Sequence, residues 1–522
     1  MTRQPPDAVV VGAGHNGLIA AAYLARAGVR VTVVERRDVI GGATVTEELA
    51  PGIRTSAASY AFGLLRPDIH RDLELERHGL VIRPKDPQMF VPLPDGRHFF
   101  VWRDAARTRE ELARIWAPDA DGYTSWSRFW DEAVRILRPV FESEEPPSLD
   151  ELQRWLGAQG REDVWRLAVT GSVADTVCEF FGSEEVRGAF ATQGLIGTNA
   201  GPHHPGTAWV MAFHAMGGEL VGMDGSWASV RGGMGALAEA VRRSCESHGV
   251  RFVCGTAVNS VLIDDGRATG IELDDGTQIP ASVVLSGADP KTTFLRLVPE
   301  GVLATYFEER VQAWPTPGSV VKVNIALSEP PDFTARHGTG PQHQGTIEIA
   351  PSLDYLQAAF ESSRGGRCSE RPWMEVFVQT SVDPTLAPEG THVLSAFSQY
   401  APAEISDWPR QRKEAGDAVI ATLSSYAPNV AGSVIACDVL GPPDLEERFG
   451  LTGGNIFHGE ILPENCFAGR FGYRTPVPGL YLCGSGAHPG GGVTGAPGRN
   501  AARAVLGDLT SDEQVAGSGE KP

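Results

Sequence analysis

Three glycines near the start of the chain, Gly12, Gly14 and Gly17, have the spacing of a turn that binds phosphate groups. They lie between a short apolar run, residues 8–11, and an alanine-rich segment, residues 18–27, which predict a buried strand and a helix. In that setting the first glycine permits a tight turn and the second lets the backbone approach a pyrophosphate. The third allows close packing of helix and strand, and the amides that open the helix face the phosphates.

A carboxylate follows the next predicted strand, residues 29–34. Glu35 stands at the carboxyl end of that strand, where it can accept hydrogen bonds from the ribose hydroxyls of a dinucleotide. The turn and the carboxylate together predict a dinucleotide site, but they do not choose between NAD and FAD.

Further glycine-rich segments favour FAD. Gly41 and Gly42 are adjacent, so their amides can line an extended cofactor, and residues 484–498 are rich in glycine and lead into a predicted helix. The N-terminus of that helix would stabilise the negative charge of a reduced flavin ring. Since residues 484–498 contain no cysteine for attachment, we expect the FAD to be noncovalent. The predicted contacts are Gly12, Gly14, Gly17, Glu35, Arg36, Gly41, Gly42, Val258, Gly484, Gly486 and Val493.

Two side chains are candidates for catalysis. Lysine is rare in this arginine-rich chain, yet Lys322 interrupts the apolar strand pattern of residues 319–327. A buried lysine is costly unless it is paired or neutralised, so this one is either functional or points to solvent through the alternation of a strand. His458, just before the C-terminal glycine-rich segment, can act as an acid or base near neutral pH, or it is a hydrogen-bonded structural histidine. No metal site is predicted.

The flavin-related segments resemble those of the phytoene (carotenoid) desaturase family, and residues 488–493 are the most specific part. Further segments are similar to a subgroup of that family named for a pyridine nucleotide-disulphide oxidoreductase domain. Residues 318–327 also resemble the strand of flavin amine oxidases whose lysine holds a water against flavin N5. The segments that carry the family and subgroup resemblances are 12–17, 35–42, 59–60, 66–67, 231–237, 383–388, 453–458 and 480–502.

The chain departs from its relatives at two places. Ala43 stands where wider relatives often have arginine after the glycine pair, so one phosphate contact must come from elsewhere. The subgroup name suggests disulphide chemistry, but the cysteines of this chain are scattered and none forms a Cys-x-x-Cys pair.

The resemblance implies an α/β fold, in which a Rossmann-like FAD-binding domain is assembled from three separated segments and an α+β substrate domain is inserted between them. We expect the FAD-binding domain to comprise residues 1–98, 225–300 and 445–510. The substrate domain would comprise residues 99–224 and 301–444, and residues 511–522 would form a disordered tail.

Composition limits the partners. The chain has 45 Lys and Arg against 65 Asp and Glu, a net charge of −20, which argues against nucleic acid and against electrostatic capture by anionic membranes. The strand pattern starts directly after the N-terminus and no apolar stretch is long enough to span a bilayer, so a cytoplasmic location is expected. Peripheral membrane contact and oligomeric state are left open.

These observations predict an FAD-dependent dehydrogenase, desaturase or oxidase that moves a hydride from a largely apolar small organic substrate to flavin N5. Two alternatives remain. One is a non-catalytic carrier of lipid or protein on the same fold, which the intact glycine set and Glu35 disfavour. The other is a flavin-dependent isomerase without net redox change.

Overall fold

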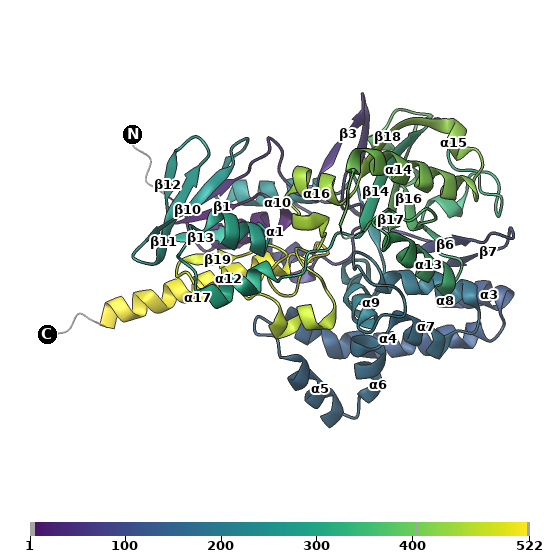
Figure 1. Cartoon of the computed structure of the whole chain (residues 1–522), viewed down its shortest axis with the longest axis horizontal. Helices are drawn as coiled ribbons and strands as arrows, with labels where there is room; N and C mark the ends of the chain where they lie inside the picture. Colours follow the sequence, from purple (N-terminus) through teal and green to yellow (C-terminus); the bar gives the residue numbers. More distant parts are fainter. Residues whose placement is uncertain (1–5, 403, 519–522) are drawn as a thin grey trace.

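A five-stranded parallel sheet forms the left half of the molecule in the computed structural model, which describes residues 6–402 and 404–518 (Figure 1). The strands pair in the order β19, β13, β1, β2 and β9. Their bounds are Leu480–Leu482, Val283–Ser286, Ala8–Val11, Val31–Val34 and Arg251–Val253. Three widely separated segments therefore build one sheet, and the predicted Rossmann-like fold is confirmed.

Three helices pack around this sheet. α1 (His15–Arg26) packs against α10 (Gly235–Ser247) and α17 (Ala496–Ser518). The alanines of α1 are buried because their small side chains allow the neighbouring helices and the sheet to come close. This packing fixes the N-terminus of α1 at the carboxyl end of β1, where the glycine turn lies.

Smaller elements surround the two large sheets. β10, β11 and β12 form an antiparallel sheet, β3 and β4 form a hairpin, and β5 pairs with β8. The bounds of these strands are Val258–Asp264, Arg267–Leu273, Gln278–Pro280, Thr46–Ala50, Ile53–Ser56, Ile82–Pro84 and Ala228–Val230. The helices α2, α11, α12 and α16 span Pro67–Asp72, Pro290–Thr292, Thr305–Gln312 and Pro442–Phe449.

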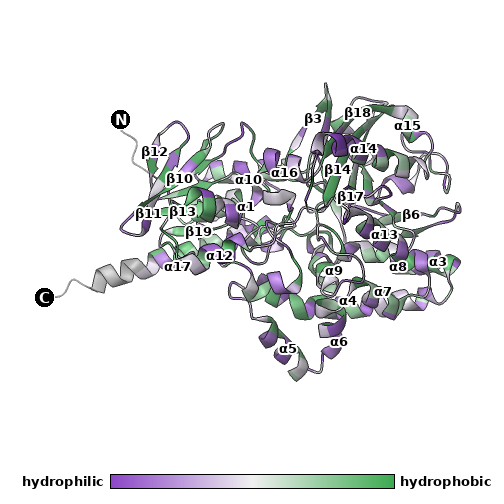
Figure 2. Cartoon of the chain, in the orientation of Figure 1, coloured by the Kyte–Doolittle hydropathy of each residue, from purple (hydrophilic) through white to green (hydrophobic). Residues whose placement is uncertain are grey.

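A seven-stranded mixed sheet forms the centre of the right half (Figure 1). Its strands pair in the order β18, β14, β17, β16, β15, β6 and β7, and their strongly apolar sequences appear green in Figure 2. Their bounds are Val434–Leu440, Val320–Leu327, His392–Gln399, Trp373–Val378, Thr346–Ile349, Met89–Pro92 and His98–Val101.

The two faces of this sheet pack against different helices. One face carries Trp373 and Phe397 and shares a core with α4, α7, α8, α9 and α13, which span Asp119–Glu142, Val173–Phe180, Glu184–Ala191, Thr207–Ala215 and Leu353–Ser363. The other face packs against α14 (Trp408–Ser424). Helices therefore cover both faces of the sheet, so a polar side chain that points from either face is buried.

The observed division of the chain differs from the predicted one at its boundaries. β6 precedes residue 98, yet it pairs with β15 in the seven-stranded sheet. Phe307 and Val311 of α12 follow residue 300, yet their apolar side chains complete the core of the parallel sheet. α17 extends to Ser518, so a helix covers most of the residues predicted as a disordered tail, and residues 519–522 lie outside the described part. The disorder of the tail stays a prediction.

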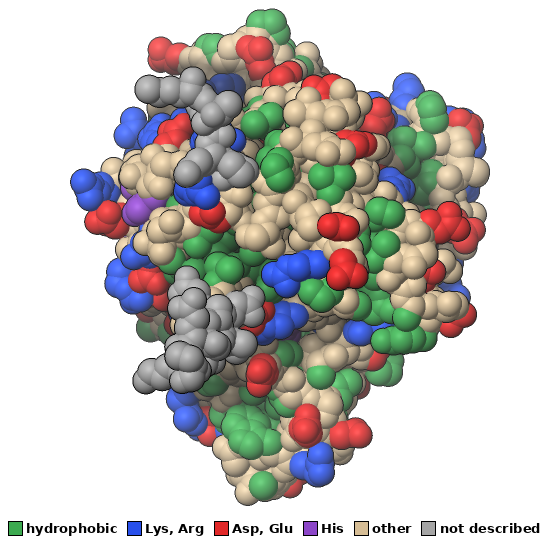
Figure 3. Space-filling model, turned by 90° about the vertical axis from the view of Figure 1, so that its left-hand side faces the viewer, with side chains coloured by type: hydrophobic (Ala, Val, Ile, Leu, Met, Phe, Trp, Pro, Cys, Tyr) green, Lys and Arg blue, Asp and Glu red, His purple; other side chains and the backbone are tan. Residues whose placement is uncertain are grey.

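Figure 3 shows the end of the molecule formed by the parallel sheet. Basic and acidic side chains are interspersed over this face, and hydrophobic side chains form several small separate groups. No helix within residues 6–402 and 404–518 is long and apolar enough to cross a membrane.

Candidate functional site

One cavity lies where the two halves meet. Its volume is about 390 Å³, within the range of roughly 300–1,000 Å³ that small-molecule sites occupy. The parallel sheet contributes the glycine turn and Glu35, the seven-stranded sheet contributes Lys322, and the C-terminal segment contributes Gly484 and Val493. Residues far apart in the sequence therefore share one cavity.

The three glycines of the turn have three different environments. Gly12 has a φ of +91°, a conformation that favours glycine. A Cβ on Gly17 would lie 2.3 Å from the carbonyl oxygen of Gly12, so this glycine is needed for packing. A Cβ on Gly14 would meet nothing within 4 Å and would extend into the cavity. This is the arrangement expected if Gly14 lets a ligand approach the backbone.

Glu35 is held at the end of β2 by two backbone amides. Its Oε2 accepts a hydrogen bond from the Ala13 amide at 2.8 Å, and its Oε1 accepts one from the Arg37 amide at 3.0 Å. The carboxylate is buried on the cavity wall, and each oxygen keeps a lone pair that can accept from a hydroxyl group.

The cavity wall includes most of the residues predicted to bind the cofactor. Gly41 and Gly486 are exceptions. Gly41 shapes the neighbouring turn, with a φ of +113° and an amide that donates to the Ala13 carbonyl at 2.8 Å. A Cβ on Gly486 would lie 2.4 Å from Cδ of Pro290, so this glycine serves packing. The predicted residues that line the cavity are Gly12, Gly14, Gly17, Glu35, Arg36, Gly42, Val258, Gly484 and Val493.

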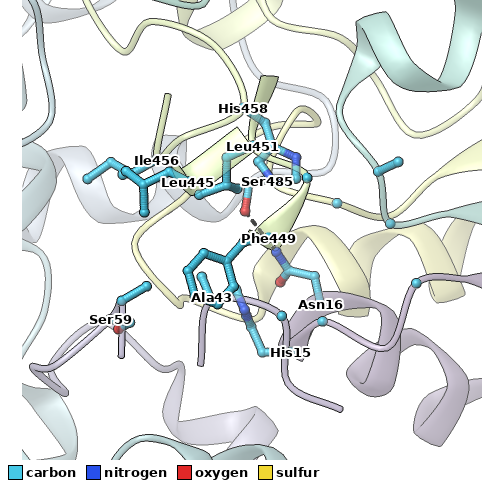
Figure 4. Close-up of a pocket in the computed structure, with 18 of the residues that line it drawn as sticks. His15, Asn16, Ala43, Ser59, Leu445, Phe449, Leu451, Ile456, His458 and Ser485 are labelled. Atoms are coloured by element: carbon cyan, nitrogen blue, oxygen red, sulfur yellow. Dashed lines mark hydrogen bonds between the residues drawn. The ribbon is translucent and has the colours of Figure 1, made fainter. Parts of the chain in front are cut away.

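The start of α1 faces the C-terminal segment across the cavity (Figure 4). Nδ2 of Asn16 donates to Oγ of Ser485 at 3.1 Å, which joins the two segments. Oδ1 of Asn16, Nε2 of His15 and Nδ1 of His458 are buried and have no hydrogen-bond partner within the described chain. Buried polar atoms are normally paired, so these atoms fit a polar ligand such as the phosphates and ribityl chain of a flavin.

His458 lies beside the glycine turn. Burial, together with the charge of His458, lowers the pKa of His15 to about 3. Burial also lowers the pKa of His458; the nearby Arg470 adds to this shift and Asp289 opposes it. Both histidines are therefore neutral at neutral pH and can donate or accept a hydrogen bond without carrying charge.

Lys322 lies on the wall formed by the seven-stranded sheet. Its side chain is 1% exposed, so the solvent-facing alternative is excluded. Its Nζ donates to Oδ1 of Asn324 at 2.8 Å and to Oγ of Ser395. Burial lowers the pKa of Lys322 to about 7, against the charge of Asp438, so the amine can exchange a proton near neutral pH.

Tyr60 is a site residue that the sequence alone did not identify. Its ring lines the cavity, and its hydroxyl donates to Oε2 of Glu375 at 2.7 Å. Tyr60 lies outside regular secondary structure, so no periodicity marks it, and its only signal was the family resemblance of residues 59–60. His214 and Trp227 of the cavity wall were missed for the same lack of a motif.

The residues on the cavity wall fit a flavin dinucleotide. The glycine turn can accept the pyrophosphate, Glu35 can bind a ribose, and the unpaired atoms near Ser485 can bind the connecting chain. Lys322 from the seven-stranded sheet and Tyr60 from a loop then line the remaining space. When bound, a flavin would supply the electron acceptor that no amino-acid side chain provides.

Known proteins share this architecture. The chain is 40% identical to pyridine nucleotide-disulfide oxidoreductase domain-containing protein 2 of Rattus norvegicus, over 96% of this chain and 94% of the rat protein. It is 27% identical to a neurosporene-forming phytoene desaturase of Rhodobacter capsulatus, over 93% of this chain and 91% of the desaturase. A putrescine oxidase variant has a similar fold, with a TM-score of 0.60, 19% identity, and coverage of 96% of this chain and 99% of the oxidase.

The family described as flavin containing amine oxidoreductase matches residues 17–506. That match spans the glycine turn from Gly17, the strand of Lys322 and the C-terminal segment. The predicted resemblance to flavin oxidoreductases is confirmed, and the chain belongs to the flavin-containing amine oxidoreductase family.

Proposed function

We propose that this protein binds FAD noncovalently and oxidises a largely apolar small organic substrate by moving a hydride to flavin N5. The observation that carries the proposal is the pairing, within one cavity, of a dinucleotide cradle with a buried amine and a phenol. The cradle accounts for the cofactor, and Lys322 and Tyr60 account for proton exchange beside it.

The surroundings of Lys322 support an apolar substrate. The cavity wall includes Tyr60 and the apolar side chains that pack in one cluster with it, which are Phe397, Ile196, Trp227, Leu64 and Phe457. None of these five side chains is acidic, so none can form an ion pair with an ammonium group, and we place carbon–carbon and carbon–oxygen bonds before amines as candidates for oxidation. Desaturation is also the reaction named for the Rhodobacter relative.

Noncovalent attachment is supported by the absence of cysteine from the described cavity wall. The cysteines of the described chain are free and none lines the cavity, which disfavours the disulphide chemistry in the name of the rat relative. A cytoplasmic location stays a prediction, to be checked by imaging the tagged protein in its cell.

The experiment is to purify the protein, identify its flavin and screen compounds for bleaching of the flavin absorbance without oxygen. Unsaturated hydrocarbons, alcohols and amines of similar size form the screen. Bleaching by hydrocarbons or alcohols supports the proposal, and bleaching by amines alone overturns the substrate class. Flavin that no compound reduces favours an isomerase, and protein that cannot bind flavin favours a carrier.

A further inference from the structure

A row of side chains crosses the inner face of the seven-stranded sheet. Lys322 of β14 pairs with Phe397 of β17, and Phe397 pairs with Glu375 of β16. Glu375 in turn pairs with Glu348 of β15. Directly paired residues of antiparallel strands point to the same face. Phe397 lines the cavity, so the row extends from the cavity to the part of the sheet that helices cover.

Glu348 is the innermost member of this row. Its side chain is 0% exposed, and neither carboxyl oxygen has a hydrogen-bond partner among the described residues. An ionised carboxylate in such a place is very costly, so the neutral acid is favoured. Burial raises the pKa of Glu348 well above its usual value, and the charge of Glu375 adds to this shift while the nearby Thr192 hydroxyl opposes it in part.

Glu375, in contrast to Glu348, has hydrogen-bond donors beside its carboxyl group. It accepts hydrogen bonds from the Tyr60 hydroxyl at 2.7 Å and from Nε2 of Gln193 at 2.6 Å. Burial raises the pKa of Glu375, but these two donors and the nearby charge of Lys85 oppose the shift. The ionised form is thus stabilised at Glu375 and the neutral form at Glu348, the arrangement of two carboxyl groups with one proton.

Tyr60 connects this pair to the cavity. Its ring lines the cavity wall while its hydroxyl reaches Glu375. The Nζ of Lys322 lies 4.8 Å from the centre of that ring, and Nζ of the buried Lys85 lies 3.9 Å from the centre of the Phe377 ring. Lys85 and Tyr60 are the titratable groups that interact with Glu375, and Asp438 is the charged group that interacts with Lys322.

We propose that Glu348 and Glu375 share one proton and receive, through the Tyr60 hydroxyl, the proton that the substrate gives up on oxidation. The inference rests on the proposed function. A bound flavin would supply the acceptor for the hydride that leaves the substrate carbon. The bond from the adjacent substrate atom to hydrogen would break, and its proton would bond to the Tyr60 oxygen. The proton of Tyr60 moves to Glu375, which becomes neutral, so one hydride and one proton leave the substrate and both are accounted for.

Infrared spectroscopy tests the shared proton without any substrate. At neutral pH the wild type should show the C=O band of a buried protonated carboxyl group. Glu348→Gln, which keeps the shape of the neutral acid, should lose this band, and the exposed-site control Glu389→Gln should keep it. Absence of the band from the wild type, or its persistence in Glu348→Gln, overturns the proposal.

The Tyr60 connection has its own readout. Transfer into D₂O shifts the carboxyl band as deuterium replaces hydrogen, and Tyr60→Phe should slow this shift about 100-fold, the low end of what a positioned proton-transfer group contributes. Loss of the phenol donor should also raise the pKa of Glu375, so that a second carboxyl band appears at higher pH than in the wild type. Unchanged exchange and an unchanged titration in Tyr60→Phe would overturn the connection.

These measurements separate the inference from the proposed function. A protein that holds flavin but lacks the carboxyl band contradicts the shared proton and leaves the oxidoreductase proposal standing. A protein that shows the band but cannot bind flavin contradicts the oxidoreductase proposal, and the proton-acceptor role then falls with it.

Discussion

The Nζ atom of Lys322 lies 4.8 Å from the centre of the Tyr60 ring, on the cavity wall that the seven-stranded sheet provides. A protonated amine in this position is attracted by the ring face, while burial favours the neutral amine. The two effects oppose each other, and the pKa of Lys322 falls to about 7. Lys322 can therefore change charge in response to events in the cavity.

The pH dependence of the protein's stability should reflect the lowered pKa of Lys322. Unfolded lysine has a pKa of about 10.4, so between pH 7 and pH 10 the unfolded chain binds a proton that the folded chain does not. Wild-type stability therefore contains a cost from Lys322 that is fully present below pH 7 and is relieved as the pH rises toward 10. Lys322→Met removes this cost, so its thermal midpoint should exceed that of the wild type most at pH 6, with the difference shrinking toward pH 10.

The exposed Lys413 offers the control for that measurement. Lys413→Met should track the wild type across the whole pH series. If the difference between Lys322→Met and the wild type is independent of pH, the amine is not neutral in the folded protein near pH 7 and above.

Lys322→Met should also change the reactions of the flavin. The variant keeps the length of the side chain, and the glycine turn and Glu35 lie on another sheet, so flavin content should stay unchanged. Stopped-flow mixing of dithionite-reduced protein with oxygen should show reoxidation slowed by about 10²- to 10⁴-fold, unless the lysine acts in flavin reduction instead. If flavin reduction and flavin reoxidation in Lys322→Met both run at the wild-type rates, the lysine has no part in catalysis.

Gly14 and Gly17 should respond differently to the same substitution. Gly14→Val places its side chain in the cavity and meets no protein atom at Cβ, so the variant should fold with the thermal midpoint of flavin-free wild type but bind no flavin. Gly17→Val places Cβ against the Gly12 carbonyl, so it should lower the midpoint even without cofactor. Full flavin occupancy in Gly14→Val would mean that the cofactor lies elsewhere.

His458 should act on flavin retention through its place beside the glycine turn. His458→Gln removes a hydrogen-bonding ring near His15, and loss of one hydrogen bond should weaken flavin binding about 2- to 10-fold. Equilibrium dialysis of the released flavin measures this, with the exposed His203→Gln as the control. If His458→Gln instead retains flavin and slows its reactions, the predicted catalytic role of His458 is supported.

The parallel sheet could be predicted closely because its signals are local. The strand at Ala8–Val11 was predicted with its observed bounds, and α1 was placed within a few residues. A buried parallel strand is a continuous apolar run, and glycines mark its end whatever the rest of the chain does. The domain boundaries were less accurate, because the pairing of β6 with β15 depends on tertiary contacts that no local pattern encodes.

A site residue could be predicted where its type is unusual for its segment. Site residues that matter only through their contacts with one another could not be predicted from the sequence. Lys322 was found because lysine is rare and its strand is apolar. Tyr60 and Glu375 were not, because each is an ordinary residue in its own segment and the bond between them joins a loop to a strand far along the chain. Glu348 and Glu375 also interrupt apolar strands, and that signal could have been read in the same way as the one at Lys322.

Flavin analysis of the freshly purified protein tests the central claim most directly. The account predicts a yellow protein whose colour is released by heat or acid, with FAD as the released compound in about one equivalent per chain. A colourless protein that stays colourless after incubation with FAD, while Gly14→Val behaves identically to it, would contradict both the cofactor and the function proposed from it.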